Sequence, residues 1–130
     1  MEKLRWDFRN LDIWKKAREL RLDVESLVKT FPKEETFRLV DQMVRAIRSV
    51  TANIAEGHGR FHYQENIQFC RQARASLFEL LDHLIVAKDN LYIQEEQYYS
   101  MENRIEDEIK LINGYVRHLH KKKAEEQSHD

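Results

Sequence analysis

The sequence predicts an all-α protein that folds as an antiparallel up-down-up-down four-helix bundle. Apolar residues recur at helical spacing in four long stretches, and the 130-residue chain contains only one proline and three glycines. The connections between the stretches are short, which forces neighbouring helices to run antiparallel. We expect one domain over residues 1–120, followed by a charged tail, residues 121–130, that is disordered.

The first helix is expected to begin near Asn10 or Asp12, because either side chain can cap it. It should end at Phe31, since a residue that precedes proline is disfavoured in helical conformation. Its apolar residues alternate four and three apart, as in a bundle seam: Ile13, Ala17, Leu20, Val24, Leu27 and Phe31.

The second helix is expected to begin at residues 34–36 and to end at Glu56. Gly57 follows directly, in the position where a left-handed C-terminal cap favours glycine. One stripe of the helix is predicted to face the core: Phe37, Val40, Val44, Ile47, Thr51 and Ile54.

The third helix, residues 62–90, carries the broadest apolar surface. Its main stripe consists of Cys70, Ala73, Leu77, Leu80, Leu84, Ala87 and Leu91. Four further apolar residues widen that stripe to about half of the circumference at roughly 100° per residue: Ile67, Phe78, Leu81 and Ile85. Either this helix is the most buried of the four, or these four residues contact a second subunit. We expect a homo-oligomer.

The fourth helix, residues 95–119, presents Tyr98, Met101, Ile105, Ile109, Ile112, Val116 and Leu119 to the core. Two charged residues fall on apolar faces, Arg74 on the third helix and Glu108 on the fourth. Folding the fourth helix back on the third brings them within about one turn at 1.5 Å rise per residue. A buried or interfacial ion pair between them would specify register more than it would stabilise the fold.

No catalytic, cofactor-binding or metal-binding constellation stands out, so we expect a protein that is not an enzyme. Cys70 lies on a core stripe with no second cysteine in the chain, which indicates an inert core residue in a reducing cytoplasm. The histidines are expected at solvated loops or helix ends: His58, His62, His118 and His120. No apolar run approaches the roughly 20 residues of a membrane span, and no membrane partner is expected.

Five arginines are candidates for binding nucleic acid, because the guanidinium group matches phosphate geometry: Arg45, Arg48, Arg60, Arg71 and Arg74. The alternative is intrahelical pairing, for example of Asp41 with Arg45 at four-residue spacing. The net charge of −1 favours that alternative, since a balanced chain is no strong polyanion binder.

The segment of residues 53–60 joins the second and third helices and holds two of the three glycines. Its distinctive residues are Asn53, Glu56, Gly57, Gly59 and Arg60. Glycines permit close backbone approach, and Arg60 beside a helix N-terminus can hold an anion. Alternatively the segment only turns the chain, and Glu56 pairs with Arg60.

In its ordered motifs the chain resembles the four-helix-bundle proteins encoded in intervening sequences of bacterial 23S ribosomal RNA genes. The resemblance rests on Leu11-x-Ile13-Trp14-x-x-Ala17, Phe31-Pro32-x-Glu34-Glu35-x-Phe37, Ile47-x-Ser49-Val50, Asn53-Ile54-Ala55-Glu56-Gly57-x-Gly59-Arg60, Ala73-x-x-Ser76-Leu77-x-Glu79-Leu80 and Leu84-Ile85-x-Ala87. The family often has proline where this chain has Thr51, so a bend of the second helix is not expected here.

The resemblance implies a bundle that assembles into a ring, with a pentamer as the expected state. The family is also similar to the accessory bundle protein of diversity-generating retroelements, a ring associated with reverse transcriptase and nucleic acid. No enzyme activity and no catalytic residue are implied. The leading hypothesis is therefore an oligomeric RNA- or DNA-associated protein. The alternative is a scaffold ring for a protein partner, without direct nucleic-acid binding.

Overall fold

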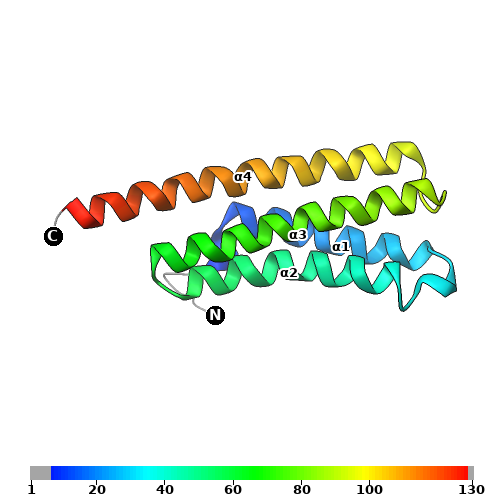
Figure 1. The fold of residues 1–130 in the computed structure, drawn as a ribbon, viewed down its shortest axis with the longest axis horizontal. Coiled ribbons are helices and arrows are strands. Elements are labelled where there is room, and N and C mark those ends of the chain that lie inside the picture. Colours follow the sequence, from blue (N-terminus) through cyan, green and yellow to red (C-terminus); the bar gives the residue numbers. More distant parts are fainter. Residues whose placement is uncertain (1–6, 129–130) are drawn as a thin grey trace.

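The computed structural model describes residues 7–128, which form helices and connecting turns with no strand in that range (Figure 1). The four long helices are α1 (Asp12–Leu27), α2 (Leu39–Gly59), α3 (Tyr63–Asp89) and α4 (Glu95–Ser128). Short 3-10 helices precede and follow α1: η1 (Phe8–Asn10), η2 (Val28–Thr30) and η3 (Lys33–Glu35). The prediction of an all-α four-helix architecture is confirmed.

The helices pack in sequence order, with α1 against α2, α2 against α3 and α3 against α4, and the bundle is closed by α1 against α4. Figure 1 shows the four helices running side by side and α4 extending beyond the α2–α3 connection. The core along their common axis contains residues from all four helices, among them Leu20, Val24, Met43, Ile47, Leu77, Leu84, Ile105 and Ile112.

Both ends of α1 differ in detail from the prediction. The N-cap residue is Leu11, which makes no side-chain hydrogen bond, so neither Asn10 nor Asp12 caps the helix. The α-helix ends at Leu27, and η2 tightens the last turn before Phe31 and Pro32. Phe31 is nevertheless buried in the core, as its spacing predicted.

The start of α2 was predicted too early, and Phe37 is wrongly assigned to the core. Arg38 has φ −122° and ψ −103°, which interrupts helical geometry between η3 and Leu39. Phe37 is therefore out of register with the stripe and is 92% exposed. Leu91 is a second wrong core assignment, because a backbone φ of 63° turns it away from α3 and leaves it exposed.

The charged segment after residue 120 is helical through Ser128 rather than disordered. Lys122 and Glu125 form an ion pair of 3.6 Å one turn apart, and the ammonium group of Lys123 donates to Gln64 Oε1 of α3 at 2.7 Å. The ion pair lies within α4, and the hydrogen bond connects the end of α4 to the start of α3. Residues 129 and 130 lie outside the described range.

None of the helices within residues 7–128 is both long and apolar enough to cross a membrane.

Candidate functional site

The corner between α2 and α3 contains the 53–60 segment, and its glycines do not serve as left-handed caps. Gly57 and Gly59 both lie inside α2, and no glycine has a positive φ. A Cβ atom on Gly57 would lie 2.8 Å from Asn66 Oδ1 and 2.8 Å from Phe69 Cβ. Gly57 is therefore required for close approach of α2 to α3, whereas a Cβ on Gly59 would meet no atom within 4 Å.

The left-handed residue of this corner is Phe61, with φ 59°. Arg60 remains in helical conformation, and its backbone N–H donates to the carbonyl of Gly57 at 3.2 Å. His62 is extended and precedes α3 without a side-chain capping bond. A bulky residue with positive φ is uncommon and carries a conformational cost, so the turn holds Phe61 in a strained conformation.

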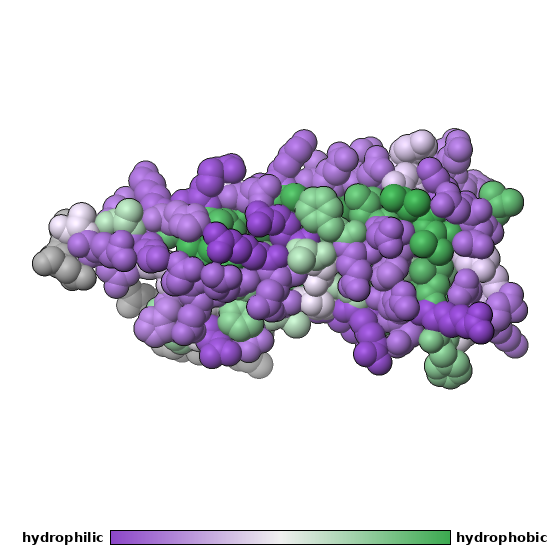
Figure 2. Space-filling view, in the orientation of Figure 1, coloured by the Kyte–Doolittle hydropathy of each residue, from purple (hydrophilic) through white to green (hydrophobic). Residues whose placement is uncertain are grey.

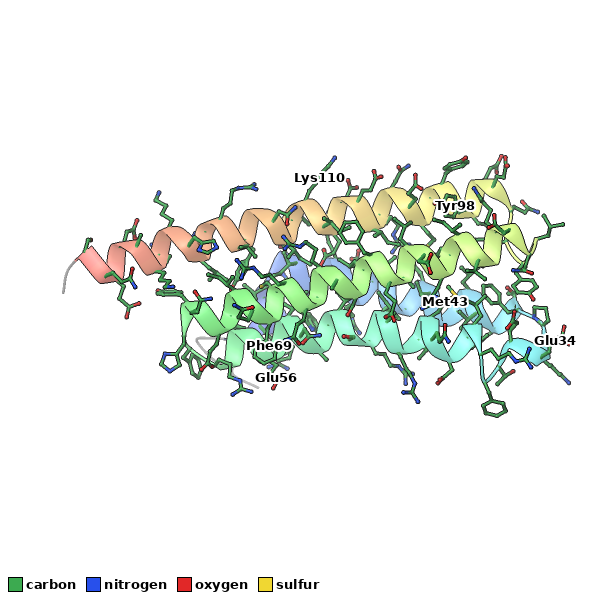
Figure 3. All side chains as sticks on the ribbon, viewed as in Figure 1. Glu34, Met43, Glu56, Phe69, Tyr98 and Lys110 are labelled. Atoms are coloured by element: carbon green, nitrogen blue, oxygen red, sulfur yellow. The ribbon has the colours of Figure 1, made fainter. Side chains whose placement is uncertain are left out.

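Polar residues of the 53–60 segment are satisfied within the chain. Arg60 forms an ion pair of 3.1 Å with Glu56, and its guanidinium carbon lies 5.2 Å from the centre of the Phe69 ring. Figure 3 shows Glu56 and Phe69 near each other where α2 meets α3. The Asn53 amide donates to Ser49 O at 2.8 Å. The pairing of Glu56 with Arg60, one of the two interpretations of this segment, is present.

A pocket of about 320 Å³ opens beside this corner, between the α2–α3 connection and the last third of α4. We call it the corner pocket. Its walls are His58, Phe61, His62, Tyr63, Asn66, Tyr115, His118, Leu119 and Lys122. At the buried Asn66, the amide group donates to the Tyr115 hydroxyl at 3.3 Å. The pocket brings together His58, His62 and His118, which the sequence alone left as separate solvated histidines.

The five candidate arginines are not gathered in one patch. Arg48 pairs with Glu25 of α1 at 2.7 Å, whereas Arg74 donates to Asn113 Oδ1 of α4 at 2.6 Å, so these two face different grooves. Arg45 pairs with Asp41 at 3.0 Å. Of the five, only Arg71, which is exposed on α3, has a side chain that makes no hydrogen bond or ion pair with another residue of the 7–128 range.

The expected Arg74–Glu108 pair does not form. Arg74 reaches Asn113 instead, and Glu108 is 2% exposed with no hydrogen-bond partner for either carboxylate oxygen within residues 7–128. Burial raises the pKa of Glu108 to about 8, and Lys16 lowers it in part. The carboxyl borders a cavity of about 90 Å³ between α1 and α4, lined also by Lys16, Glu19, Leu20, Arg104 and Asp107.

Cys70 is fully buried, and its thiol lies 3.6 Å from Asn66 Oδ1 as a weak donor. Burial raises the pKa of this thiol to about 11, which keeps it protonated and unreactive at neutral pH. Across residues 7–128, no three His, Cys, Asp or Glu side chains are grouped as ligands for a metal ion.

The outer surface of α3 carries exposed apolar side chains, as the sequence predicted for part of its face. Phe78 is 54% exposed, Ile85 is 38% exposed and Leu81 is half-buried. Ile67, assigned to the same interface, is fully buried in the core, so a partner subunit cannot contact it. Figure 2 shows a band of hydrophobic side chains between α3 and α4.

The fold places this chain among all-α proteins built from four packed helices. A family model described as the 23S rRNA-intervening sequence protein matches residues 9–114. The chain belongs to this family.

Among solved structures, the chain is similar to a protein of unknown function from Bacteroides thetaiotaomicron, assigned to the S23 ribosomal protein family. The two share 25% sequence identity with a TM-score of 0.74, over 80% of this chain and 97% of that one. No curated protein matches the chain.

Proposed function

We propose that this protein is a non-enzymatic, self-associating bundle that works as a binding scaffold, and that RNA or DNA is its ligand. The observation that carries self-association is the exposed apolar surface formed by Phe78, Leu81 and Ile85. These residues are spaced three and four apart, so they form one continuous strip along α3. Contiguous apolar surface of this kind marks interaction sites. The family resemblance supports a ring, with five subunits as the expected number.

Light scattering coupled to size exclusion tests the assembly. Phe78→Glu and Ile85→Glu should each reduce the mass to that of a monomer and leave the helical circular dichroism unchanged, because a charge in a desolvated contact is costly. Leu22→Glu is the matched control, since Leu22 is 46% exposed on α1 and lies outside the strip. A wild-type protein that is monomeric at micromolar concentration contradicts the proposal.

Nucleic-acid association is supported by Arg45, Arg48 and Arg60, which follow the face of α2 opposite its core stripe. Each is paired with a carboxylate, but the arginine side chains are 80%, 65% and 49% exposed. Exposed ion pairs contribute only about 0–1 kcal/mol, so a phosphate group can replace the carboxylate partner. In an oligomer, this row of arginines would be repeated on every subunit.

Filter binding to structured RNA and to duplex DNA at two salt concentrations tests this part. Arg45→Glu combined with Arg48→Glu should abolish binding, and wild-type affinity should fall steeply with salt. Lys15→Glu combined with Arg18→Glu makes the same charge change at exposed positions of α1 and should have little effect. Normal binding by the α2 double variant would leave a scaffold for a protein partner as the better description.

The basic residues of the last helical segment need a separate control, because a lysine-rich end can bind polyanions without a shaped site. Removal of residues 121–130 should leave most nucleic-acid binding intact. If truncation eliminates binding and the Arg45 and Arg48 double variant binds normally, the arginines of α2 are not the nucleic-acid contacts.

A further inference from the structure

The corner pocket has the size and position of a ligand site. Its volume of about 320 Å³ lies within the range typical of small-molecule pockets, roughly 300–1,000 Å³. Its walls come from segments distant in the sequence: the α2–α3 connection, the first turn of α3, and α4 near Tyr115 and Lys122. It is separate from the apolar strip of α3 and from Arg45 and Arg48 of α2.

The charge lining the pocket is one-sided. Of its nine residues, four carry cationic or imidazole groups and none is acidic: Lys122, His58, His62 and His118. The chain as a whole contains 23 acidic and 22 basic residues, so an acid-free surface of this size is a distinctive local feature. By contrast, the groove between α1 and α2 includes Glu25, and the cavity beside Glu108 includes two further carboxylates. The corner pocket therefore favours an anionic ligand.

Aromatic rings form the rest of the wall. Phe61, Tyr63 and Tyr115 all line the pocket, and Phe61 is 65% exposed at its edge. The rings of Tyr115 and His118 are 6.3 Å apart. Planar aromatic groups stack on such side chains, and a nucleobase does so regardless of its identity. The ligand that satisfies both parts of the wall combines a planar ring with a negative charge.

The pocket is also held in shape by the core. The Asn66 side chain donates to the Tyr115 hydroxyl of α4 at 3.3 Å, which connects the α3 wall to α4. The same side chain accepts from the Cys70 thiol at 3.6 Å, one turn along α3. Gly57 allows α2 to approach this asparagine, because a Cβ there would lie 2.8 Å from Asn66 Oδ1. The left-handed φ of Phe61 directs the chain from α2 into α3 at the pocket edge. A preformed wall lowers the ordering cost of binding.

We propose that the corner pocket binds a nucleoside 5′-monophosphate group, either as a free nucleotide or as one unpaired nucleotide of an RNA strand. The base stacks on Phe61 and Tyr115, and the phosphate contacts Lys122 and His118. Lys122 is available for this role because its ion pair with Glu125 is weak. The two groups are 3.6 Å apart, and their side chains are 46% and 49% exposed. This proposal does not depend on nucleic-acid binding by Arg45, Arg48 and Arg60 of α2.

Isothermal titration of the full chain with AMP, adenosine and inorganic phosphate tests both halves of the site. AMP should bind more tightly than either fragment. Lys122→Ala should weaken AMP binding about 10-fold, the effect of losing one charge-assisted hydrogen bond. Lys121→Ala, which removes a lysine outside the pocket, should change it less than about 2-fold. His118→Ala and His120→Ala form a second matched pair, since only His118 lines the pocket.

The stacking half is tested by Phe61→Gly. Glycine adopts the left-handed conformation without strain, so the variant should melt no lower than the wild type. Its affinity for AMP should fall about 10-fold, within the range for loss of one base-stacking aromatic, whereas its affinity for phosphate should not change. If Phe61→Gly nevertheless unfolds, the Lys122 and Lys121 pair still decides the question.

Three results overturn the proposal: no AMP binding at millimolar concentration, phosphate binding as tightly as AMP, or equal losses in the Lys121 and Lys122 variants.

Competition with a short single-stranded RNA distinguishes a free nucleotide from a nucleotide of an RNA strand as the ligand. Displacement of AMP, together with loss of RNA affinity in Lys122→Ala, identifies a strand nucleotide; AMP binding without competition identifies a free nucleotide. Arg45→Glu with Arg48→Glu should leave AMP binding unchanged. The nucleotide site can therefore be tested independently of nucleic-acid binding by the α2 arginines.

Discussion

The α2–α3 and α1–α4 contacts of the bundle differ in how closely the helices pack and in whether a buried carboxyl group lacks a partner. Between α2 and α3, Ser49 and Ser76 share a hydrogen bond of 2.9 Å, and Gly57 brings the two backbones close together. Between α1 and α4, Arg104 and Asp23 form an ion pair of 2.7 Å at the surface, and Glu108 is buried beneath it beside a small cavity. In the first contact the backbones lie close together and Ser49 is paired with Ser76; the second contains a carboxyl group of which neither oxygen has a partner within residues 7–128.

This difference indicates where the fold can loosen. Unpaired buried polar groups cost free energy, whereas satisfied ones are close to neutral or stabilising. The α2–α3 pair should therefore remain folded under conditions that begin to separate α4 from α1. It also carries one wall of the corner pocket, while α4 supplies the other.

The largest expected effect is at Gly57. Gly57→Val places a branched side chain where even a Cβ atom would overlap Asn66 and Phe69, and it should lower the free energy of unfolding by about 3 kcal/mol. Gly59→Ala is the matched control, because space is open there and alanine favours helix; it should stabilise by about 0.5 kcal/mol. Urea denaturation measures both. Equal effects at the two glycines would contradict close packing at this corner.

Glu108→Gln should abolish a pH dependence of stability. Between its ordinary pKa of 4.5 and the folded value of about 8, the unfolded chain has released the Glu108 proton and the folded chain has kept it. The free energy of unfolding therefore falls as pH rises across this window, and levels off above it. The neighbouring charges are Lys16, Glu19, Arg104 and Asp107.

At pH 9, Glu108→Gln should stabilise the protein by about 2 kcal/mol, and at pH 4 it should have little effect. Thermal unfolding across this pH range, with the exposed Glu106→Gln as control, measures the difference. Parallel pH profiles for Glu108→Gln and the wild type would mean that the carboxyl is hydrated or paired in solution.

Ser49→Ala should cost about 1 kcal/mol, the usual value of one neutral hydrogen bond, because Ser76 loses its partner. The Ser49 hydroxyl also accepts from the Asn53 amide at 2.9 Å, but that amide keeps its second bond, to the carbonyl of residue 49, so no larger loss is expected. Chemical denaturation measures the change. A cost below the error of measurement would show that water replaces the Ser49 hydroxyl, and that water reaches this part of the α2–α3 contact.

The smallest expected effect is at the surface of the α1–α4 contact. Arg104→Ala removes the ion pair with Asp23, whose carboxylate is 57% exposed, and should cost about 0.5 kcal/mol. Addition of 1 M salt should reduce even this difference, since exposed pairs are screened. A cost well above that of Ser49→Ala would reverse the ranking of the two contacts.

Periodicity predicted the helices and most of the core, because burial of one face repeats along each helix and leaves a regular signal. Phe37 and Leu91 were assigned wrongly because each lies at a helix end, where one irregular backbone angle removes the residue from register. Gly57 was misread because spacing near a helix end predicts a cap, whereas its actual role depends on contact with another helix.

The candidate site was less accessible to sequence reasoning. The partners of Arg74 and Glu108 depend on helix rotation, which periodicity fixes only to about a residue, so the predicted pair was wrong. The corner pocket was missed because its two walls are 49 or more positions apart in the sequence. One signal was present: Tyr115, His118 and Lys122 share a helix face at spacings of three and four, beside the predicted position of the α2–α3 connection.

The left-handed backbone of Phe61 has a consequence for how this position varies during evolution. Glycine or asparagine would occupy the same conformation more easily, and either would remove a large apolar ring from the surface. Selection for stability and solubility alone therefore disfavours an aromatic residue here. If relatives with an equivalent corner keep an aromatic side chain at this position, the ring is maintained for contact with something outside the bundle. Relatives with glycine at this position would be those in which the aromatic ring no longer makes that contact.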